Sequence, residues 1–380
     1  MKKILFVTGT RADYGKLKSL MRKVDQHPNF ELHIFATGMH LLSRYGATYK
    51  EIENDGFVNI YKFVNQKLNQ PMDITLSNTI IGFSNYVSEI EPDLIVVHGD
   101  RIEALAGAIV GAINNIQVAH IEGGEVSGTI DESIRHAITK FSHIHLVANE
   151  EAKQRVIQLG EKNESIYVIG SPDIDIMYSN ELPSIIEAKQ RYDIFFDQYA
   201  ILMYHPVTTE VNLLEEHIKE VVNALIMSNK QYIVVFPNND EGSQIILDAY
   251  SCLEENLNFR VFPSIRFEYF LTLLSNASFI IGNSSAGVRE AEVYGVPTID
   301  LGSRQNGRYN KETINNIINV EENMESILSA IKEVSGLFFS KQTSFGNGDS
   351  AEKFMNILEG PSLWEVSPQK HFVPLVSQNG

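Results

Sequence analysis

Three carboxylates in the first half of the 380-residue sequence have positions suited to acid–base chemistry. Asp100 ends the apolar run "LIVVHGD", Glu122 ends "VAHIE", and Asp131 stands nine residues later at the expected start of a helix. Parallel strands bring their carboxyl ends to one edge of a sheet, so these side chains are expected to converge. Crowded like charges can raise the pKa of some members and create an acid or a base. Alternatively, Asp131 could be only a helix N-cap or part of an acidic first turn.

A second group of residues has the types and spacing of a diphosphate site. In "IIGNSSAGVREAE", a predicted strand is followed by a helix that starts around Ser284 and Ser285. A helix start favours anions, and Glu290, about two turns into the predicted helix, could accept hydrogen bonds from a ribose diol. Arg304 and Arg308 in "LGSRQNGR" could offset phosphate charge. The alternative is an ordinary capped helix beside surface arginines.

Other strand ends and loops carry further candidates. His205, in "MYHPVTTE", could bind phosphate or transfer a proton, although an isolated histidine can equally be structural. Asn238 follows the next predicted strand, and Ser264 and Phe267 in "FPSIRFEYF" stand where a base ring could lie, or in the core. Arg11, in the first loop "TGTRADYGK", is compatible with phosphate binding. The glycines of that loop match neither the dinucleotide nor the P-loop pattern.

Charge and cysteine content exclude several classes of protein. A net charge of -17 disfavours nucleic acid as a partner, because the chain would repel a polyphosphate backbone. Cys252 is the only cysteine, which excludes an internal disulfide and a cysteine-based metal cluster, and no other metal-ligand pattern is apparent. The start "MKKILFVTGT" has too few apolar residues for a signal peptide or a membrane span. We therefore expect a cytoplasmic protein without a membrane partner.

Short apolar runs that alternate with helical stretches must position these residues. In the first half the runs include 4–7, 94–97 and 118–121, and the second half repeats the pattern with runs such as 200–203 and 298–301. Stretches with apolar residues three and four positions apart lie between them. This alternation predicts parallel sheets covered on both faces. The predicted fold class is α/β, with two Rossmann-like, doubly wound domains.

The predicted boundary between the domains lies in "IGSPDIDIM", where Ser171, Pro172 and Asp173 interrupt the pattern. Residues 1–170 would form the domain with the carboxylates, and residues 171–360 the domain with the anion site. The tail 361–380, which contains Trp364 and Pro374, is expected to pack back on the first domain.

Together these motifs resemble those of the hydrolysing UDP-N-acetylglucosamine (UDP-GlcNAc) 2-epimerases of bacterial sialic acid biosynthesis. The resemblance runs across nearly the whole chain and includes "PDLIVVHGDRIEALAG", "HIEGGEVSGTIDESIRHAITKFSHIHLVANE", "HPVTTE", "GNSSAGVREAEVYGVP" and "GSRQNGR". "GTRADYGK" matters most, since non-hydrolysing relatives begin with a loop of the Gly-Thr-Arg-Pro-Glu kind. The resemblance implies the glycosyltransferase B type of fold, with two Rossmann-like domains facing a cleft.

The resemblance also implies a reaction and the residues that perform it. UDP-GlcNAc and water would give N-acetylmannosamine (ManNAc) and UDP, by elimination to 2-acetamidoglucal and then hydration with inversion at C2. This route passes through an alkene, so no redox cofactor is needed. Asp100, Glu122 and Asp131 match the family's catalytic acids, and His205 its cleft histidine, with the C2 base left unassigned. The family's nucleotide contacts fall on Arg11, Asn238, Ser264, Phe267, Ser284, Ser285, Glu290 and Arg304.

The motifs leave several alternatives open. A relative acting on a UDP-2,4-diacetamido-2,4,6-trideoxyhexose, on the way to legionaminic acid, would share them, because they do not discriminate C4 and C6 of the sugar. A non-hydrolysing epimerase, a UDP-sugar glycosyltransferase of the same fold and a non-catalytic nucleotide-sugar sensor are the other candidates. The family also suggests a homodimer or homotetramer that serves capsule or surface polysaccharide synthesis.

Overall fold

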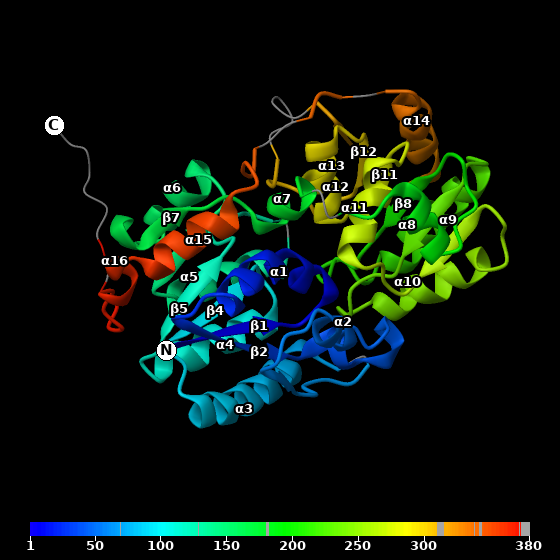
Figure 1. The fold of residues 1–380 in the computed structure, drawn as a ribbon. Coiled ribbons are helices and arrows are strands. Elements are labelled where there is room, and N and C mark those ends of the chain that lie inside the picture. The colour runs from blue at the N-terminus through cyan, green and yellow to red at the C-terminus, as the bar shows by residue number, and fades with distance from the viewer. Residues whose placement is uncertain are drawn as a thin grey trace. The chain divides into compact units, whose positions relative to one another are not determined.

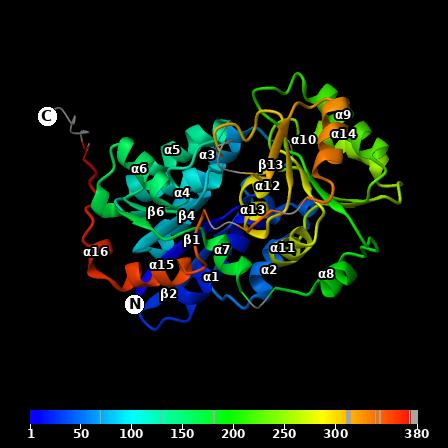
Figure 2. The ribbon, with the colours of Figure 1, turned by 90° about the horizontal axis from the view of Figure 1, so that it is seen from above.

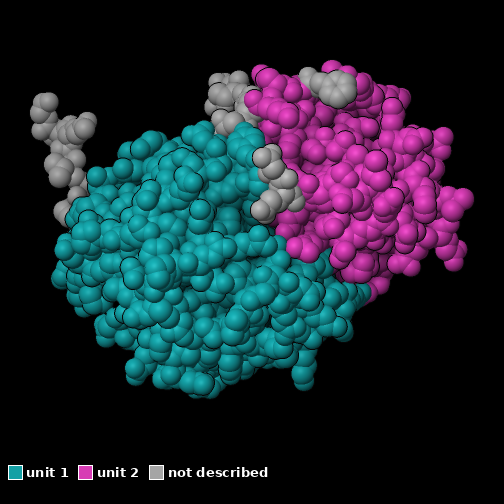
Figure 3. Space-filling view, viewed as in Figure 1, with its two compact units in different colours: residues 1–125, 131–179, 344–380 teal, residues 126–130, 180–343 magenta. Residues whose placement is uncertain are grey.

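The computed structural model describes residues 1–68, 70–127, 129–179, 182–309, 315–337, 339–341, 344–371 and 373. They form two compact units, each built on a parallel sheet (Figures 1 and 3). Unit 1 comprises Met1–Glu125, Asp131–Ser179 and Ser344–Gly380, and unit 2 comprises Val126–Ile130 and Asn180–Thr343. Two parallel-sheet α/β units confirm the predicted fold class. Within the described ranges, no helix is both long and apolar enough to cross a bilayer.

The sheet of unit 1 runs in the order β3-β2-β1-β4-β5-β6-β7, with all neighbouring strands parallel. Its strands are β1 (Lys2–Thr8), β2 (Phe30–Ala36), β3 (Ile60–Lys62), β4 (Leu94–His98), β5 (Gln117–Ile121), β6 (Ile144–Val147) and β7 (Ile166–Val168). The strand order reverses between β1 and β4. The carboxyl ends of these strands are therefore the place where open α/β sheets bind ligands.

Helices cover both faces of this sheet (Figure 2). Successive residues of β1 point to opposite faces, so Ile4 and Phe6 join one core while Leu5 and Val7 join the other. The first core contains residues of α1 (Arg11–Asp25), α15 (Ser350–Glu359) and α16 (Pro361–Trp364). The second contains residues of α3 (Met72–Ile90), α4 (Ile102–Ile113) and α5 (Ile130–Phe141). The remaining helices of the unit are α2 (Tyr49–Asn54), α6 (Glu150–Gln158) and α7 (Pro172–Met177).

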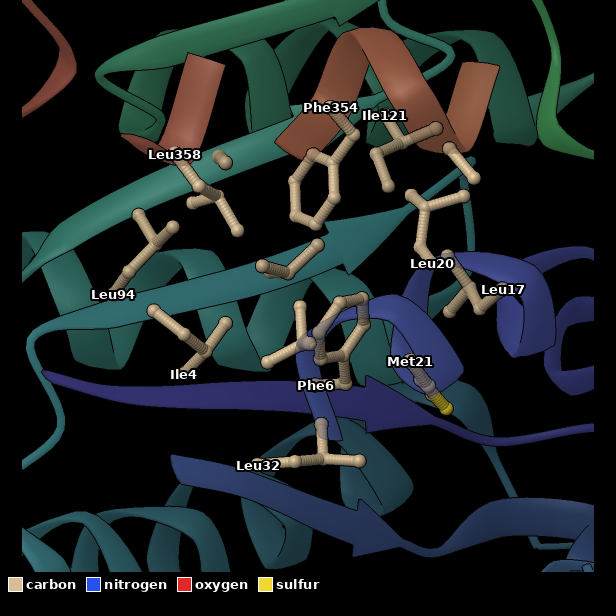
Figure 4. Close-up of a cluster of buried hydrophobic side chains, with 14 of the residues drawn as sticks. Ile4, Phe6, Leu17, Leu20, Met21, Leu32, Leu94, Ile121, Phe354 and Leu358 are labelled. Atoms are coloured by element: carbon tan, nitrogen blue, oxygen red, sulfur yellow. The ribbon is translucent and has the colours of Figure 1, made fainter. Parts of the chain in front are cut away.

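The C-terminal part of the chain completes the core of unit 1. Phe354 of α15 meets Phe6 of β1 edge to face, with ring centroids 6.1 Å apart (Figure 4). Farther along, Trp364 stacks on Phe30, and the Val366 carbonyl accepts a hydrogen bond from Gln117 at 2.7 Å. Of the predicted tail, residues 361–371 and 373 are described, and Pro374 lies outside the described residues.

The compact units differ from the predicted domains at both boundaries. Residues 171–179 belong to unit 1, because α7 packs against α1, and the chain re-enters unit 1 at Ser344, before residue 361. The apolar face of α15 accounts for the second difference, since it is buried in the unit 1 core.

Unit 2 repeats the architecture with the strand order β10-β9-β8-β11-β12-β13, again all parallel. The strands are β8 (Ala200–Met203), β9 (Tyr232–Val235), β10 (Phe259–Phe262), β11 (Ile280–Gly282), β12 (Thr298–Leu301) and β13 (Ile317–Val320). The helices are α8 (Ile185–Arg191), α9 (Leu214–Met227), α10 (Ser243–Tyr250), α11 (Phe267–Ser275), α12 (Ser285–Val288), α13 (Glu290–Tyr294) and α14 (Met324–Val334). Residues of α9, α10 and α14 share one core with the sheet, and the order reverses between β8 and β11.

Candidate active site

Asp100 lies against a buried guanidinium in unit 1. It follows β4 closely and accepts a hydrogen bond from Arg135 Nη2, while Arg135 Nη1 donates to Glu125 at 3.2 Å. The Arg135 side chain is only 3% exposed. Burial disfavours its charge, but the surrounding carboxylates, those of Asp100, Glu125 and Glu122, raise its pKa above the ordinary value. The sequence patterns do not single out Arg135, although its spacing of four from Asp131 was an available signal.

Glu122 combines a buried carboxylate with a left-handed backbone. Its φ is 63°, a conformation that costs about 1–3 kcal/mol in a non-glycine residue and tends to be kept at functional sites. Glu122 Oε1 accepts a hydrogen bond from Ser171 Oγ, and Oε2 lies 3.3 Å from His98 Nε2. His98 and Ser171 were not predicted as partners, because only the fold brings their segments beside β5.

Asp131 lies in the first turn of α5 and is partly exposed. The helix begins at Ile130, so Asp131 lies within the first turn and is not the N-cap. Arg135 follows four residues later, on the same face of the helix. The structure therefore gathers Asp100 and Glu122 around Arg135 and places Asp131 one turn along the helix from it.

Arg11 is the first residue of α1, after the N-cap Thr10. Its guanidinium forms an ion pair with Glu51 of α2. A capping box between Thr10 and Asp13 fixes the start of α1, and so fixes the backbone position of Arg11.

In unit 2, His205 and Asn283 join the ends of the neighbouring strands β8 and β11. The His205 amide donates to Asn283 Oδ1 at 2.7 Å, and Asn283 Nδ2 donates back to the His205 carbonyl at 2.8 Å. The backbone amide of Asn238 donates to His205 Nδ1 at 3.0 Å. Because Nδ1 accepts this bond, a proton on the neutral ring resides on Nε2. The backbone of His205 is thus held by Asn283, and its imidazole by the amide of Asn238.

The loop after β12 is tied to the start of α12. The Asn283 carbonyl accepts hydrogen bonds from Arg304 Nη1 at 3.1 Å and from Gln305 Nε2 at 2.7 Å. Ser284 caps α12, with its Oγ accepting from the Ala286 amide at 3.3 Å, and Ser285 is the first residue of that helix. Four predicted positions, His205, Ser284, Ser285 and Arg304, therefore surround one buried asparagine.

The predicted position of Glu290 needs correction. The sequence pattern suggests one helix with Glu290 two turns inside it, whereas the chain forms two short helices, and Glu290 begins the second one, α13. Arg289 separates the two helices, with a backbone φ of -99° and ψ of -67°. Thr298 Oγ1 donates to the Gly287 carbonyl at 2.7 Å, in place of the next helical turn. Glu290 is nevertheless buried, with only 3% of its surface exposed.

Three predicted contacts lie around the ends of β9 and β10. Asn238 Nδ2 donates to Asp240, while Asn238 Oδ1 is buried without a hydrogen-bond partner in the described part of the chain. Ser264 is partly exposed in the loop before α11, and Phe267 is the buried first residue of that helix.

The fold also groups three side chains that the sequence does not single out. Glu210, His217 and Glu322 bring possible ligand atoms within 4.8 Å of one another. His217 Nδ1 lies 3.1 Å from Glu322, which also accepts from Tyr204, and Glu210 accepts from Ser303 at 2.7 Å. These bonds connect the loops that follow β8, β12 and β13.

Known proteins similar to this chain agree with the fold and the motifs. Residues 22–359 match the family described as UDP-N-acetylglucosamine 2-epimerase. The chain is 48% identical over 379 residues to a Neisseria meningitidis serogroup B protein named UDP-N-acetylglucosamine 2-epimerase, covering 99% of this chain and 100% of the relative. It is 34% identical over 365 residues to the Legionella pneumophila UDP-N,N'-diacetylbacillosamine 2-epimerase (hydrolyzing), covering 94% and 96%.

Solved structures support the same fold. A UDP-GlcNAc 2-epimerase from Neisseria meningitidis, crystallised with UDP-GlcNAc, superposes with a TM-score of 0.78 at 19% identity, over 94% of this chain and 99% of that one. The Methanocaldococcus jannaschii UDP-GlcNAc 2-epimerase gives 0.79 at 24%, with the same coverage. These neighbours have the glycosyltransferase B type of fold that the motifs predict. With the match over most of its length and its 48% identity to a full-length relative, this chain belongs to the UDP-N-acetylglucosamine 2-epimerase family.

Proposed function

We propose that this protein is a hydrolysing UDP-GlcNAc 2-epimerase, which converts UDP-GlcNAc and water into ManNAc and UDP as the first step of sialic acid synthesis. The 48% identity over the full length of the Neisseria meningitidis relative carries the proposal for the substrate. The loop "GTRADYGK" and the 34% identity to a relative named as hydrolyzing support the hydrolytic outcome.

The reaction requires two proton transfers at C2. A base removes the C2 proton, the C–H electron pair forms the C1=C2 double bond, and the C1–O bond breaks so that UDP leaves with its electron pair. Water then adds to 2-acetamidoglucal, with hydroxide bonding to C1. A proton reaches C2 from the face opposite to the one that lost its proton, which inverts C2. No ring carbonyl acidifies the C2 proton, so catalysis needs a positioned base and a stabilised leaving group.

In the proposed mechanism, Asp100, Glu122 and Asp131 carry out the proton transfers. The Arg135 guanidinium holds the Asp100 carboxylate in one orientation, and Ser171 binds one oxygen of Glu122. Positioning of this kind supplies much of the rate gain in reactions that depend on a near-attack geometry.

Unit 2 is proposed to bind UDP and to stabilise it as it leaves. Arg304 and the hydroxyls of Ser284 and Ser285 would contact the diphosphate, Glu290 the ribose, and His205 would donate from Nε2. Because α12 has only four residues, we assign the diphosphate contacts mainly to these side chains rather than to a helix dipole. The other proposed contacts of the nucleotide are Arg11, Asn238, Ser264 and Phe267.

Proton NMR of the purified protein with UDP-GlcNAc in deuterated water tests the proposal. Free ManNAc with deuterium at C2, released together with UDP, is the expected product. UDP-linked N-acetylmannosamine would instead demonstrate a non-hydrolysing epimerase. An unchanged spectrum would overturn the proposed substrate.

A second candidate substrate is the UDP-linked 2,4-diacetamido-2,4,6-trideoxy sugar, favoured by the 34% identity to the Legionella pneumophila relative. Turnover of this sugar with no turnover of UDP-GlcNAc, under the same conditions, would select it. If neither sugar reacts, a screen of acceptors for glycosyl transfer tests the glycosyltransferase alternative. We also propose that the protein is cytoplasmic and forms a homodimer or homotetramer. Sedimentation of the purified protein would check the oligomeric state.

A further inference from the structure

His120 lies between the loop that carries Asp100 and the helix that carries Arg135. It belongs to β5 and is 0% exposed. His120 Nε2 lies 2.8 Å from the Gly99 carbonyl oxygen, and Nδ1 lies 3.1 Å from Thr139 Oγ1. A carbonyl oxygen can only accept a hydrogen bond, so Nε2 carries the proton and Nδ1 accepts from the Thr139 hydroxyl.

The His120 ring is neutral at working pH. Burial lowers the pKa of His120 to about 3, and this effect outweighs the opposing bond to Gly99. A neutral imidazole has one donor and one acceptor, and here both are in use. His120 is therefore not available for proton transfer, and its bonds serve to connect two elements.

These bonds constrain the peptide immediately before Asp100. Gly99 has a φ of 74°, which glycine adopts without strain, and its amide donates to the Ile121 carbonyl at 3.0 Å. The amide of Gly99 is thus held by the β5 backbone and its carbonyl by His120. Thr139 lies one turn after Arg135 on α5. The second bond of His120 therefore holds α5, the helix that carries Arg135.

Gly123 leaves room for this arrangement. A Cβ at position 123 would come within 3.0 Å of His120 Nδ1 and 3.1 Å of Thr139 Oγ1. A side chain there would force the His120 ring or the Thr139 hydroxyl to move by a few tenths of an ångström. The chain therefore has a glycine where the bond between His120 and α5 needs the space.

We propose that His120 is a positioning residue that sets the distance between Asp100 and Arg135 by bonding Gly99 and Thr139. The inference rests on the proposed catalytic role of Asp100. Displacement of a reacting group by about 1 Å can cost roughly a hundredfold in rate, so small movements of Gly99 would be measurable in kcat.

Three variants test this role. His120→Phe keeps a ring of similar size without hydrogen bonds, whereas His120→Gln keeps an N–H that can reach the Gly99 carbonyl. His145→Phe is the matched control, because His145 pairs in register with His120 on β6, is equally buried and bonds to Glu161 instead of the Asp100 loop. The kcat and KM of each variant are measured with whichever UDP-sugar the wild-type protein converts.

We expect His120→Phe to lower kcat by roughly 10- to 100-fold with KM within about threefold, and His120→Gln to restore most of the loss. His145→Phe is expected to lower the melting temperature but to leave kcat within about twofold. Equal losses of kcat in the two phenylalanine variants, or no rescue by glutamine, would overturn the inference.

A readout that does not need turnover separates this inference from the proposed function. The guanidinium nitrogen signals of Arg135 in ¹⁵N spectra should shift in His120→Phe and return toward the wild-type position in His120→Gln. Unchanged Arg135 signals in His120→Phe would refute the positioning role. A wild-type protein inactive on both sugars would instead contradict the proposed function.

Discussion

At the scale of single residues, the candidate acids of unit 1 have very different surroundings. Glu122 is buried on a left-handed backbone, Asp100 pairs with Arg135, and Asp131 is partly exposed on a helix. Environments that differ in this way allow chemically similar carboxyl groups to act at different steps of one reaction.

Replacing each of these carboxylates with its amide is expected to remove most turnover. Asp100→Asn, Glu122→Gln and Asp131→Asn keep the size of the side chain but cannot accept a proton, so kcat should fall at least about 100-fold. UDP affinity, measured by calorimetry, should stay within several-fold. Variants that lost UDP binding but kept turnover at saturation would contradict the assignment of the chemistry to unit 1. Exposed Asp73, changed to Asn, is a suitable control.

Glu103 is a further buried carboxylate, with a side chain 3% exposed. It packs so closely on Gly38 that a Cβ there would come within 2.8 Å of Glu103 Oε1. Burial raises the pKa of Glu103, and the nearby Arg101 opposes the change only in part. With a folded-state pKa above the unfolded value, unfolding releases a proton, so stability is lost as the pH rises through the folded-state pKa.

The pH dependence of stability in Glu103→Gln follows from this sign. The neutral amide does not titrate, so the variant should gain stability relative to wild type as the pH rises from the ordinary glutamate pKa of 4.5 toward the raised folded-state pKa. Urea unfolding at several pH values measures the difference. A difference that is constant over this range would mean that Glu103 is ionised throughout in the folded protein.

At the scale of elements, the short helix α12 follows β11. Its N-cap, Ser284, and its first residue, Ser285, are two of the predicted nucleotide contacts. Ser284→Ala removes both the cap of α12 and a proposed phosphate contact, and a lost cap alone costs about 1 kcal/mol. We expect UDP affinity, measured by calorimetry, to fall several-fold, and Glu290→Ala should weaken UDP binding as well. Asn323→Ala removes the comparable cap of α14 and serves as the control. Equal weakening by the control would indicate a general loss of structure.

The elements differ in how far the sequence predicts them. Strands such as β4 are buried on both faces, so they read as continuous apolar runs, and the residues after them could be predicted as candidates for a site. The break between α12 and α13 was not predictable, because a bond from Thr298 to Gly287 helps to set it. Arg135 and His120 were missed for the same reason, since their roles depend on partners from other elements.

At the scale of the whole molecule, unit 1 is assembled from both ends of the chain. Phe354→Ala would leave a cavity beside Phe6 and should reduce the free energy of unfolding by about 3–5 kcal/mol. Phe195→Ala is the matched control, because this ring is 85% exposed and its loss should change stability by at most about 0.5 kcal/mol. Denaturant unfolding compares the two, and similar effects would mean that α15 contributes little to the core.

A fragment of residues 1–179 lacks the helix that completes its core. We expect it to melt without cooperativity, and to regain a cooperative transition when it is co-expressed with residues 344–380. Near-ultraviolet circular dichroism and amide exchange report the change. A cooperative transition of the fragment by itself would contradict this expectation.

The discontinuity of unit 1 also sets the order of events during protein synthesis. A ribosome that adds about 5–20 residues per second takes roughly ten to thirty seconds to travel from Ser179 to Ser344. Throughout that interval the nascent chain exposes the apolar surface of β1 and α1 that α15 later covers. Unit 2 is continuous apart from residues 126–130, and all of it has been synthesised once Thr343 is added, before the segment that completes unit 1. Residues 1–179 are therefore expected to wait for the rest of the chain before their core is complete.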